Sequence, residues 1–237
     1  DKSFQTALSN HNYPAIVAEQ LGRALATSLL LSATLKFDGS LIMQIRGNGP
    51  ISMLVAQADD QQAVRGLAHW DGDVPKGNLT ALFGDGVLVM TIKPTHGKAY
   101  QGVVSLEGGC LADALHAYFE QSEQLKTRLW FAVDNERVVG LMLQELPEHD
   151  GKATDWQRVE LLANTITDNE LLTLDAETII HRLFHEESVR LYDPKPVSFT
   201  CDCSRKKVEN SLLTLGLEEL RSLIEEKGVI EADCDFC

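Results

Sequence analysis

Positive charge is scarce in this chain of 237 residues. Lysine and arginine number 21 against 35 aspartates and glutamates, which gives a formal net charge of −14 at pH 7. A nucleic-acid-binding surface attracts phosphates with basic side chains, so this balance disfavours nucleic acid as a partner. Hydrophobic residues make up 44% of the chain, which is normal for a globular protein, and the length allows one sizeable domain with a small appendage.

Long hydrophobic runs are also lacking. The longest apolar stretch runs from Ala24 to Leu35, and Glu19 and Arg23 interrupt its extension toward the N-terminus. A membrane-spanning helix needs about 20 apolar residues, so we expect no membrane insertion. No signal-like segment starts the chain, although Asp1 is not an initiator methionine and this absence therefore excludes little.

Signatures of an enzyme are missing as well. The glycine-rich stretches 47–49 and 84–86 do not continue into a phosphate-binding fingerprint, so we interpret both as turns. No grouping of serine, histidine and carboxylate indicates nucleophilic catalysis. We therefore assign no catalytic residue and predict that the protein is not an enzyme.

Cysteine is rare, but its placement is specific. Four of the five cysteines form two close pairs, Cys201-Asp202-Cys203 and Cys234-Asp235-Phe236-Cys237. Each pair can supply two sulfurs to a tetrahedral zinc ion, at about 2.3 Å from the metal. We predict one structural zinc ion, because four sulfur ligands leave no open position for a substrate. Two structural disulfides or two unrelated redox motifs are the alternative interpretations. The predicted ligands are Cys201, Cys203, Cys234 and Cys237.

Two short helices are predicted between the cysteine pairs. Ser204 can cap a helix through about Leu213, and a second helix fits Leu217 to Lys227 with Gly228 as its stop. Metal binding would then join these helices into a small module. The apolar residues at helical spacing are Val208, Leu212 and Leu213 in the first helix and Leu217, Leu220, Leu223 and Ile224 in the second.

The pattern of residues 1–148 indicates an α+β domain with an antiparallel sheet. A helix expected to begin at Pro14 is nearly apolar all round after Arg23, as a buried central helix should be. After this helix, apolar residues recur at every second position, which predicts an antiparallel hairpin of strands at 41–46 and 51–57. Cys110 precedes a further helix, and we interpret it as a packing residue with a free thiol rather than a reactive site. Strands are expected at 63–70, 86–92, 99–106, 128–133 and 138–144, and the further helix at 110–121.

A break at 147–152 separates this domain from a helical segment. An extended tether is expected at 192–196, just before the first cysteine. We predict three parts: a core domain at 1–148, a helical linker at 149–197 and a C-terminal four-cysteine module at 198–237. The linker helices are expected at 156–163, 169–174 and 176–185. Since the linker has no sheet of its own, its apolar residues must pack elsewhere, and they are Leu161, Leu162, Ile166, Leu171, Leu172, Ile179, Ile180, Leu183 and Phe184.

The residues around the cysteines resemble a known family. The runs Phe199-Thr200-Cys201-Asp202-Cys203-Ser204-Arg205 and Cys234-Asp235-Phe236-Cys237 are similar to the redox-regulated heat-shock chaperones of bacteria, the thirty-three-kilodalton heat-shock protein family. Family members usually have more chain before the position of Asp1 and beyond the last cysteine, so we expect both ends to be trimmed. The similarity covers essentially the whole chain, through residues 33–39, 100–104, 122–125 and 185–187.

The resemblance implies a cytoplasmic, ATP-independent holdase that is inactive while reduced and zinc-bound. On oxidation, the family pairing would join Cys201 to Cys203 and Cys234 to Cys237. The module would then lose its metal and its fold, since modules with so little core depend on metal binding. The linker helices would loosen and expose apolar faces to unfolded client proteins, and the active form would be a homodimer.

Two other functions remain as alternatives. A constitutive zinc-binding adaptor would bind its partner with the metal in place. A thiol-disulfide oxidoreductase needs an exposed thiolate beside a thioredoxin-like βαβ unit, which the antiparallel pattern does not supply. The response to oxidation distinguishes the three functions. Of the three, the holdase is the one that should suppress aggregation after oxidation and not before it.

Overall fold

A large mixed sheet organises the fold. The computed structural model describes residues 1–34, 38–106, 108–146 and 153–237. Within them six strands pair in the order β5-β4-β1-β2-β3-β8, all antiparallel except β8, which runs parallel to β3. The predicted α+β class with an antiparallel sheet is therefore confirmed. The strands are β1 (Gly39–Arg46), β2 (Ile51–Asp59), β3 (Ala63–Trp70), β4 (Val87–Pro94), β5 (Tyr100–Ser105) and β8 (Ser198–Phe199).

The hairpins follow the predicted pattern. In β1 the side chains of Leu41, Met43 and Ile45 are buried, and the residues between them are partly exposed. This alternation places one face of the strand against the core, as a period of two requires. The β4–β5 hairpin turns at Gly97, whose φ of 122° suits glycine.

Helix α2 (Ala15–Ser32) is the centre of the molecule. It begins after Pro14 and is buried on most of its surface, as the apolar pattern predicts. The helix contacts β1, β2 and β3 on one side and the second sheet on the other. Gly66 on β3 allows this close approach, since a Cβ there would lie 2.8 Å from both a Leu25 methyl carbon and the Val55 carbonyl oxygen.

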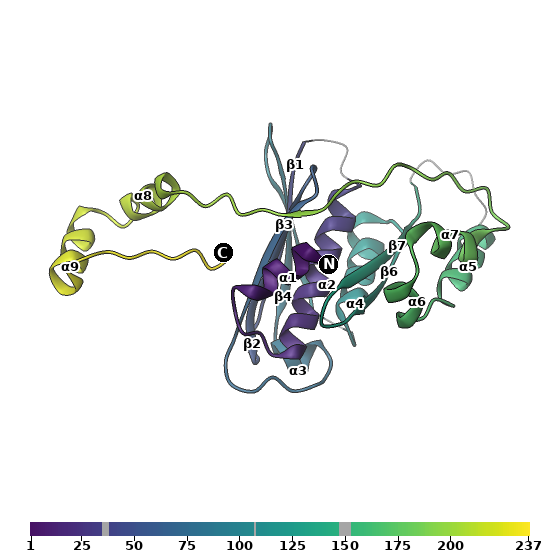
Figure 1. Ribbon diagram of the computed structural model, residues 1–237, viewed down its shortest axis with the longest axis horizontal. Helices are drawn as coiled ribbons and strands as arrows, with labels where there is room; N and C mark the ends of the chain where they lie inside the picture. The colour runs from purple at the N-terminus through teal and green to yellow at the C-terminus, as the bar shows by residue number, and fades with distance from the viewer. Residues whose placement is uncertain (35–37, 107, 147–152) are drawn as a thin grey trace.

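A two-stranded antiparallel sheet covers the other side of α2 (Figure 1). It consists of β6 (Thr127–Val133) and β7 (Val138–Gln144). The carboxylate of Asp134 accepts hydrogen bonds from the backbone N–H groups of Glu136 and Arg137, and these bonds close the connecting turn. The helix expected at 110–121 divides into α4 (Leu111–Tyr118) and a π-helical turn, η1 (Phe119–Glu123).

Two short helices have no counterpart in the sequence analysis. Helix α1 (Lys2–Ser9) buries Phe4 and Ala7, and helix α3 (Leu79–Phe83) buries Leu79, Leu82 and Phe83. Both are short, and their apolar residues become interpretable as a buried face only when the neighbouring elements are in place.

The linker helices α5 (Ala153–Ala163), α6 (Asp168–Thr173) and α7 (Ala176–Phe184) are present as predicted. Their apolar cluster packs on β6 and β7 rather than on the large sheet, and its buried members are Ala132, Leu171, Ile179 and Leu183. The expectation that Leu161 packs elsewhere in the protein is wrong, because this side chain is 68% exposed. The break at 147–152 lies outside the described residues.

The C-terminal helices α8 (Arg205–Leu213) and α9 (Leu217–Lys227) also match the prediction. The Ser204 hydroxyl caps α8 by accepting the Lys207 backbone N–H, and Gly228 ends α9 with a φ of 75°. The apolar residues of the two helices pack little against each other, since the side chain of Leu213 is 67% exposed and that of Ile224 is 50% exposed. The side chain of Leu217 lies outside the described residues. No helix in the described ranges is both long and apolar enough to cross a membrane.

The chain path connects the two ends of the molecule. In Figure 1 the linker helices lie on one side of the large sheet, and α8 and α9 project from the opposite side. An extended segment crosses between them before β8, where the tether is predicted. The C-terminal residues then return from α9 toward the sheet.

Candidate metal centre

The first cysteine segment, residues 201–203, is positioned by the edge of the large sheet. It directly follows β8, which pairs with Ala63 and Val64 of β3. The Thr200 backbone N–H donates to the Val64 carbonyl at 3.1 Å and continues this pairing to the residue before Cys201. The segment that leads to Cys201 is therefore paired with the edge of the sheet, and this pairing sets where the first two sulfurs lie.

The second cysteine segment, residues 234–237, returns to the same region. The side-chain amide of Asn10 donates to the Phe236 carbonyl at 2.7 Å, and His11 Nε2 lies 2.8 Å from the Asp235 carbonyl oxygen. On β3, His69 Nε2 lies 3.6 Å from the Asp235 carboxylate. The N-terminal part of the chain thus contacts the last residues.

The four sulfurs converge. Cys201 Sγ lies 3.5 Å from Cys234 Sγ, and Cys203 Sγ lies 3.3 Å from Cys237 Sγ. All four sulfurs lie within 4.8 Å of one another, close enough to hold a metal ion, and all are free thiols. A tetrahedral site with metal–sulfur bonds of about 2.3 Å places its sulfurs roughly 3.8 Å apart, so the donor set and the spacing fit such an ion.

The fifth cysteine is not part of this cluster. Cys110 is half-buried at the start of α4, and its thiol lies 3.4 Å from the Asp113 carboxylate. That carboxylate also accepts the backbone N–H groups of Gly109 and Cys110. The Asp113 carboxylate thus caps the start of α4 beside a free thiol, and the role of Cys110 as a packing residue stays a prediction.

Clustering changes the acidity of the thiols. Partial burial raises the pKa of Cys201, but hydrogen bonds from the Cys203 backbone N–H and from the neighbouring thiols outweigh it, and the pKa falls to about 7. The pKa of Cys237 is raised, because its hydrogen bonds to Cys203 and Cys201 are made by its protonated form. The lowered pKa of Cys201 favours its thiolate form, which is both a metal ligand and a nucleophile.

Charged and aromatic neighbours of the cluster were missed in the sequence analysis. The Asp202 carboxylate accepts from Arg65 at 2.6 Å and pairs with Lys207, and these cations hold the pKa of Asp202 below its ordinary value, Lys207 contributing most. The guanidinium carbon of Arg65 lies over the ring of Phe236, 4.6 Å from the ring centroid. Nothing in the pattern of β3 marks Arg65, because its partners lie at the far end of the chain.

Exposure differs within the cluster. Cys203 and Cys237 are exposed, whereas Cys201 and Cys234 are half-buried. A small oxidant can therefore reach two of the sulfurs directly. In the region 198–237 none of the described side chains is fully buried, so these side chains form no buried apolar core of their own.

Comparisons with known proteins agree with the geometry. The profile of the family described as "Hsp33 protein" matches residues 1–237. A 33 kDa chaperonin of Nitrosococcus oceani is 53% identical over 237 residues, which are 100% of this chain and 82% of that protein. A 33 kDa chaperonin of Vibrio cholerae is 43% identical over 242 positions, covering 100% of this chain and 83% of its own.

A solved structure extends the similarity to three dimensions. The crystal structure of the 33 kDa chaperonin (heat shock protein 33 homologue) of Thermotoga maritima matches with a TM-score of 0.85 and 26% sequence identity, covering 99% of this chain and 84% of that one. The profile match along the whole chain and the identities with curated relatives show that the chain belongs to the Hsp33 family, whose named members are chaperonins and not enzymes.

Proposed function

We propose that this protein is a redox-regulated, ATP-independent holdase of the cytoplasm. Reduced cysteines 201, 203, 234 and 237 hold one zinc ion and keep the protein inactive. Their oxidation to disulfides opens the protein, which binds unfolding proteins as a homodimer. The observation that carries the proposal is the convergence of four free thiols in a part of the chain whose described side chains are not buried.

The donor set favours zinc. Four thiolates select a soft or borderline cation and disfavour magnesium or calcium, which prefer oxygen. Zinc would supply a cross-link between residues 201–203 and 234–237, in place of an apolar core. This part of the chain folds only when its four cysteines bind the ion, since metal-dependent modules gain ~10 to 16 kcal/mol from metal binding.

Oxidation removes the ligands. Two thiols and one hypochlorous acid give one disulfide, water, chloride and a proton, so each pair loses two electrons to the oxidant. The exposed sulfurs of Cys203 and Cys237 are the accessible points of attack. Pairing of Cys201 with Cys203 and of Cys234 with Cys237, as in the family, closes very small loops that restrain the chain little. Such bridges cannot replace a cross-link between the two segments.

The linker helices are held in a way that suits reversible release. Their buried cluster is small, and polar contacts supply the rest: Arg137 donates to the Leu172 carbonyl at 2.9 Å and the Trp130 indole to Asn164 at 3.2 Å. The ion pairs of these helices have side chains that are 18–52% exposed, and ion pairs near the surface contribute little individually, typically below ~1 kcal/mol. Loss of one point of attachment should therefore loosen the linker helices. The ion pairs are Arg128–Glu160, Arg158–Glu187 and Arg182–Glu170.

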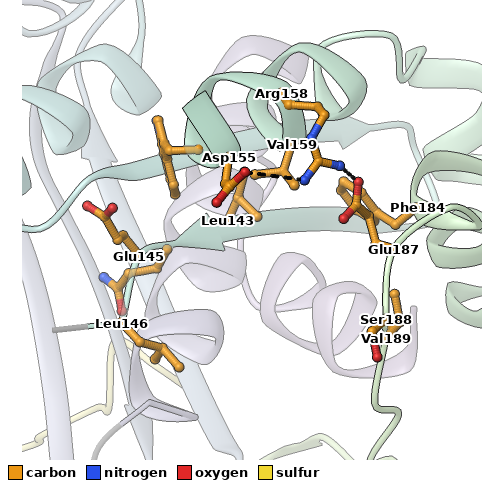
Figure 2. Close-up of a pocket in the computed structure, with 12 residues that line it drawn as sticks. Leu143, Glu145, Leu146, Asp155, Arg158, Val159, Phe184, Glu187, Ser188 and Val189 are labelled. Carbon is orange, nitrogen blue, oxygen red and sulfur yellow. Dashed lines mark ion pairs between the residues drawn. The ribbon is translucent and has the colours of Figure 1, made fainter. Parts of the chain in front are cut away.

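An apolar cavity marks the point where the tether leaves the linker helices (Figure 2). Its volume is about 500 Å³, and it lies among the end of β7, α5 and the residues after α7. Arg158 on α5 pairs with Glu187, three residues after the end of α7, and the Arg158 guanidinium also lies 3.7 Å from the Asp155 carboxylate. Displacement of residues 187–189 would expose the rest of the apolar lining, which includes Leu143, Trp156, Val159 and Phe184.

The path of the chain suggests how the two parts are connected. Residues between α7 and β8 join the linker helices to the strand that precedes Cys201. If the cysteine module unfolds, β8 has two ladder positions to hold it on β3, which is a weak attachment. We accordingly propose three functional parts: a core at 1–148, a linker at 149–197 that provides client-binding surface, and a sensing module at 198–237.

The direct test follows zinc content and chaperone activity in the same sample. We expect one zinc per reduced chain and no suppression of thermal aggregation, then zinc release and suppression after hypochlorous acid. Reduction with zinc should restore the inactive state. Equal suppression by the reduced, zinc-loaded protein would contradict the switch and favour a constitutive adaptor, and turnover of a dithiol substrate would favour an oxidoreductase.

A further inference from the structure

One arginine of the sheet contacts both cysteine segments. Arg65 lies in β3 opposite Gln57 of β2, and its side chain is 21% exposed. Its Nε and Nη2 groups donate to the Gln57 side-chain oxygen at 3.2 and 3.0 Å. These bonds fix the guanidinium on the rigid sheet and leave Nη1 directed to the cysteine segments.

The first segment is bound through charge. Arg65 Nη1 donates to the Asp202 carboxylate at 2.6 Å and lies 3.8 Å from Cys201 Sγ. Asp202 is the residue between two cysteines of the cluster, so its position fixes the backbone that carries both. The guanidinium also places positive charge next to a sulfur.

The second segment is bound through an aromatic ring. The Arg65 guanidinium carbon lies 4.6 Å from the centroid of Phe236, within the range of a cation–π contact. Phe236 immediately precedes Cys237 and is half-buried. One side chain of the sheet therefore contacts a residue in each cysteine segment, Asp202 between Cys201 and Cys203 and Phe236 next to Cys237.

We propose that Arg65 is a positioning residue that couples metal binding to the docking of the cysteine module on the β3 edge. The inference rests on the proposed metal site. A site of four thiolates and one divalent ion carries a net charge of −2 (−4 + 2), which the nearby guanidinium partly offsets. Because Arg65 holds the two segments in one place, it also lowers the conformational entropy that the cysteines lose when they bind the ion.

The key variant is Arg65→Ala. Loss of a residue that orients metal ligands weakens metal affinity by about 10- to 100-fold, and we expect a loss in this range for zinc, measured by competition with a chromophoric chelator. Hydrogen exchange at Thr200, whose N–H bonds to β3, should become faster in the reduced, zinc-loaded variant. An arginine that only stabilises the sheet would lower the unfolding midpoint and leave zinc affinity unchanged.

Matched variants distinguish the contributions of the positive charge of Arg65, of its planar guanidinium and of the aromatic ring of Phe236. Arg65→Lys keeps the charge but loses the planar fork, so it should recover part of the affinity. Phe236→Ala removes the aromatic partner without altering the sheet and should also weaken zinc binding. In the double variant the combined loss should be smaller than the product of the single losses, since both act through one contact. Arg46→Ala is the control, because Arg46 lies on β1 opposite Met53 and Val87 and is exposed.

The outcomes distinguish this inference from the proposed function. Wild-type protein that binds no zinc when reduced contradicts the proposed function and the coupling with it. Wild-type protein that binds zinc, while Arg65→Ala and Phe236→Ala bind it equally well and exchange Thr200 at the same rate, contradicts the coupling alone. If Arg65→Ala does not fold, Phe236→Ala and Arg65→Lys decide by the same two measurements.

Discussion

The sheet core and the cysteine module differ in what holds them together. In the core the side chains of Leu21, Met43 and Leu54 are fully buried, and each such side chain contributes ~1.5 to 3 kcal/mol by leaving water. In the module, residues 198–237, no described side chain is fully buried, although two regular helices are present. Helices of this length are marginal alone in water. The comparison teaches that packing holds the core together, whereas the described residues of the module lack such packing, and we propose that its sulfurs replace it.

Removal of two ligands is the change with the largest expected effect. Cys201→Ser with Cys203→Ser should reduce zinc content from one ion per chain to none and make residues 198–237 sensitive to protease without oxidant. The core should remain folded, because its packing does not involve the cysteines. Cys110→Ser is the control, since this thiol lies at the start of α4, outside the cluster. Unchanged zinc content in the double variant would refute the ligand assignment.

A pair of leucine variants tests the other side of the comparison. Leu21→Ala in α2 should destabilise the core by ~2 to 5 kcal/mol through the cavity it leaves, and zinc affinity should stay the same. Leu213→Ala in α8 should change stability by less than ~0.5 kcal/mol, because that side chain is 67% exposed. Urea unfolding followed by circular dichroism measures both. Similar losses for the two variants would show that the module has a core after all.

A smaller change weakens the linker helices without altering the large sheet or the cysteine module. Leu171→Ala in α6 removes a buried side chain from their cluster and should cost ~2 kcal/mol or more. We expect the reduced variant to keep its zinc and to suppress aggregation partially. Leu161→Ala is the matched control, because Leu161 lies on α5 and is 68% exposed. Full inactivity of a loosened Leu171→Ala protein would argue against the linker helices as a client-binding surface.

Elements with a strong local pattern were predictable from the sequence. The period of two in β1 and β2, the apolar length of α2, and the Ser204 and Gly228 caps all express local preferences that the structure confirms. The convergence of four cysteines was predictable too, because their spacing has few other uses. The zinc ion itself and the oxidised disulfide pairing stay predictions.

Features that depend on distant partners were not predictable. Strand β8 has only two residues and exists because it pairs with β3. The contact between Arg65 and Phe236 joins residues far apart in the chain, and neither is marked by periodicity or spacing. The exposure of Leu161 likewise reflects how α5 lies beside α7, which its own sequence does not specify.

The most direct test of the central claim is hydrogen exchange of the reduced protein, measured with zinc bound and after its removal by a chelator. The account predicts that amides in α8, α9 and the Ser198–Thr200 stretch lose protection first, that those of α5–α7 follow, and that those of α2 and β1 keep theirs. Equal protection of residues 198–237 with and without zinc would contradict the claim that the metal replaces a core in this part of the protein.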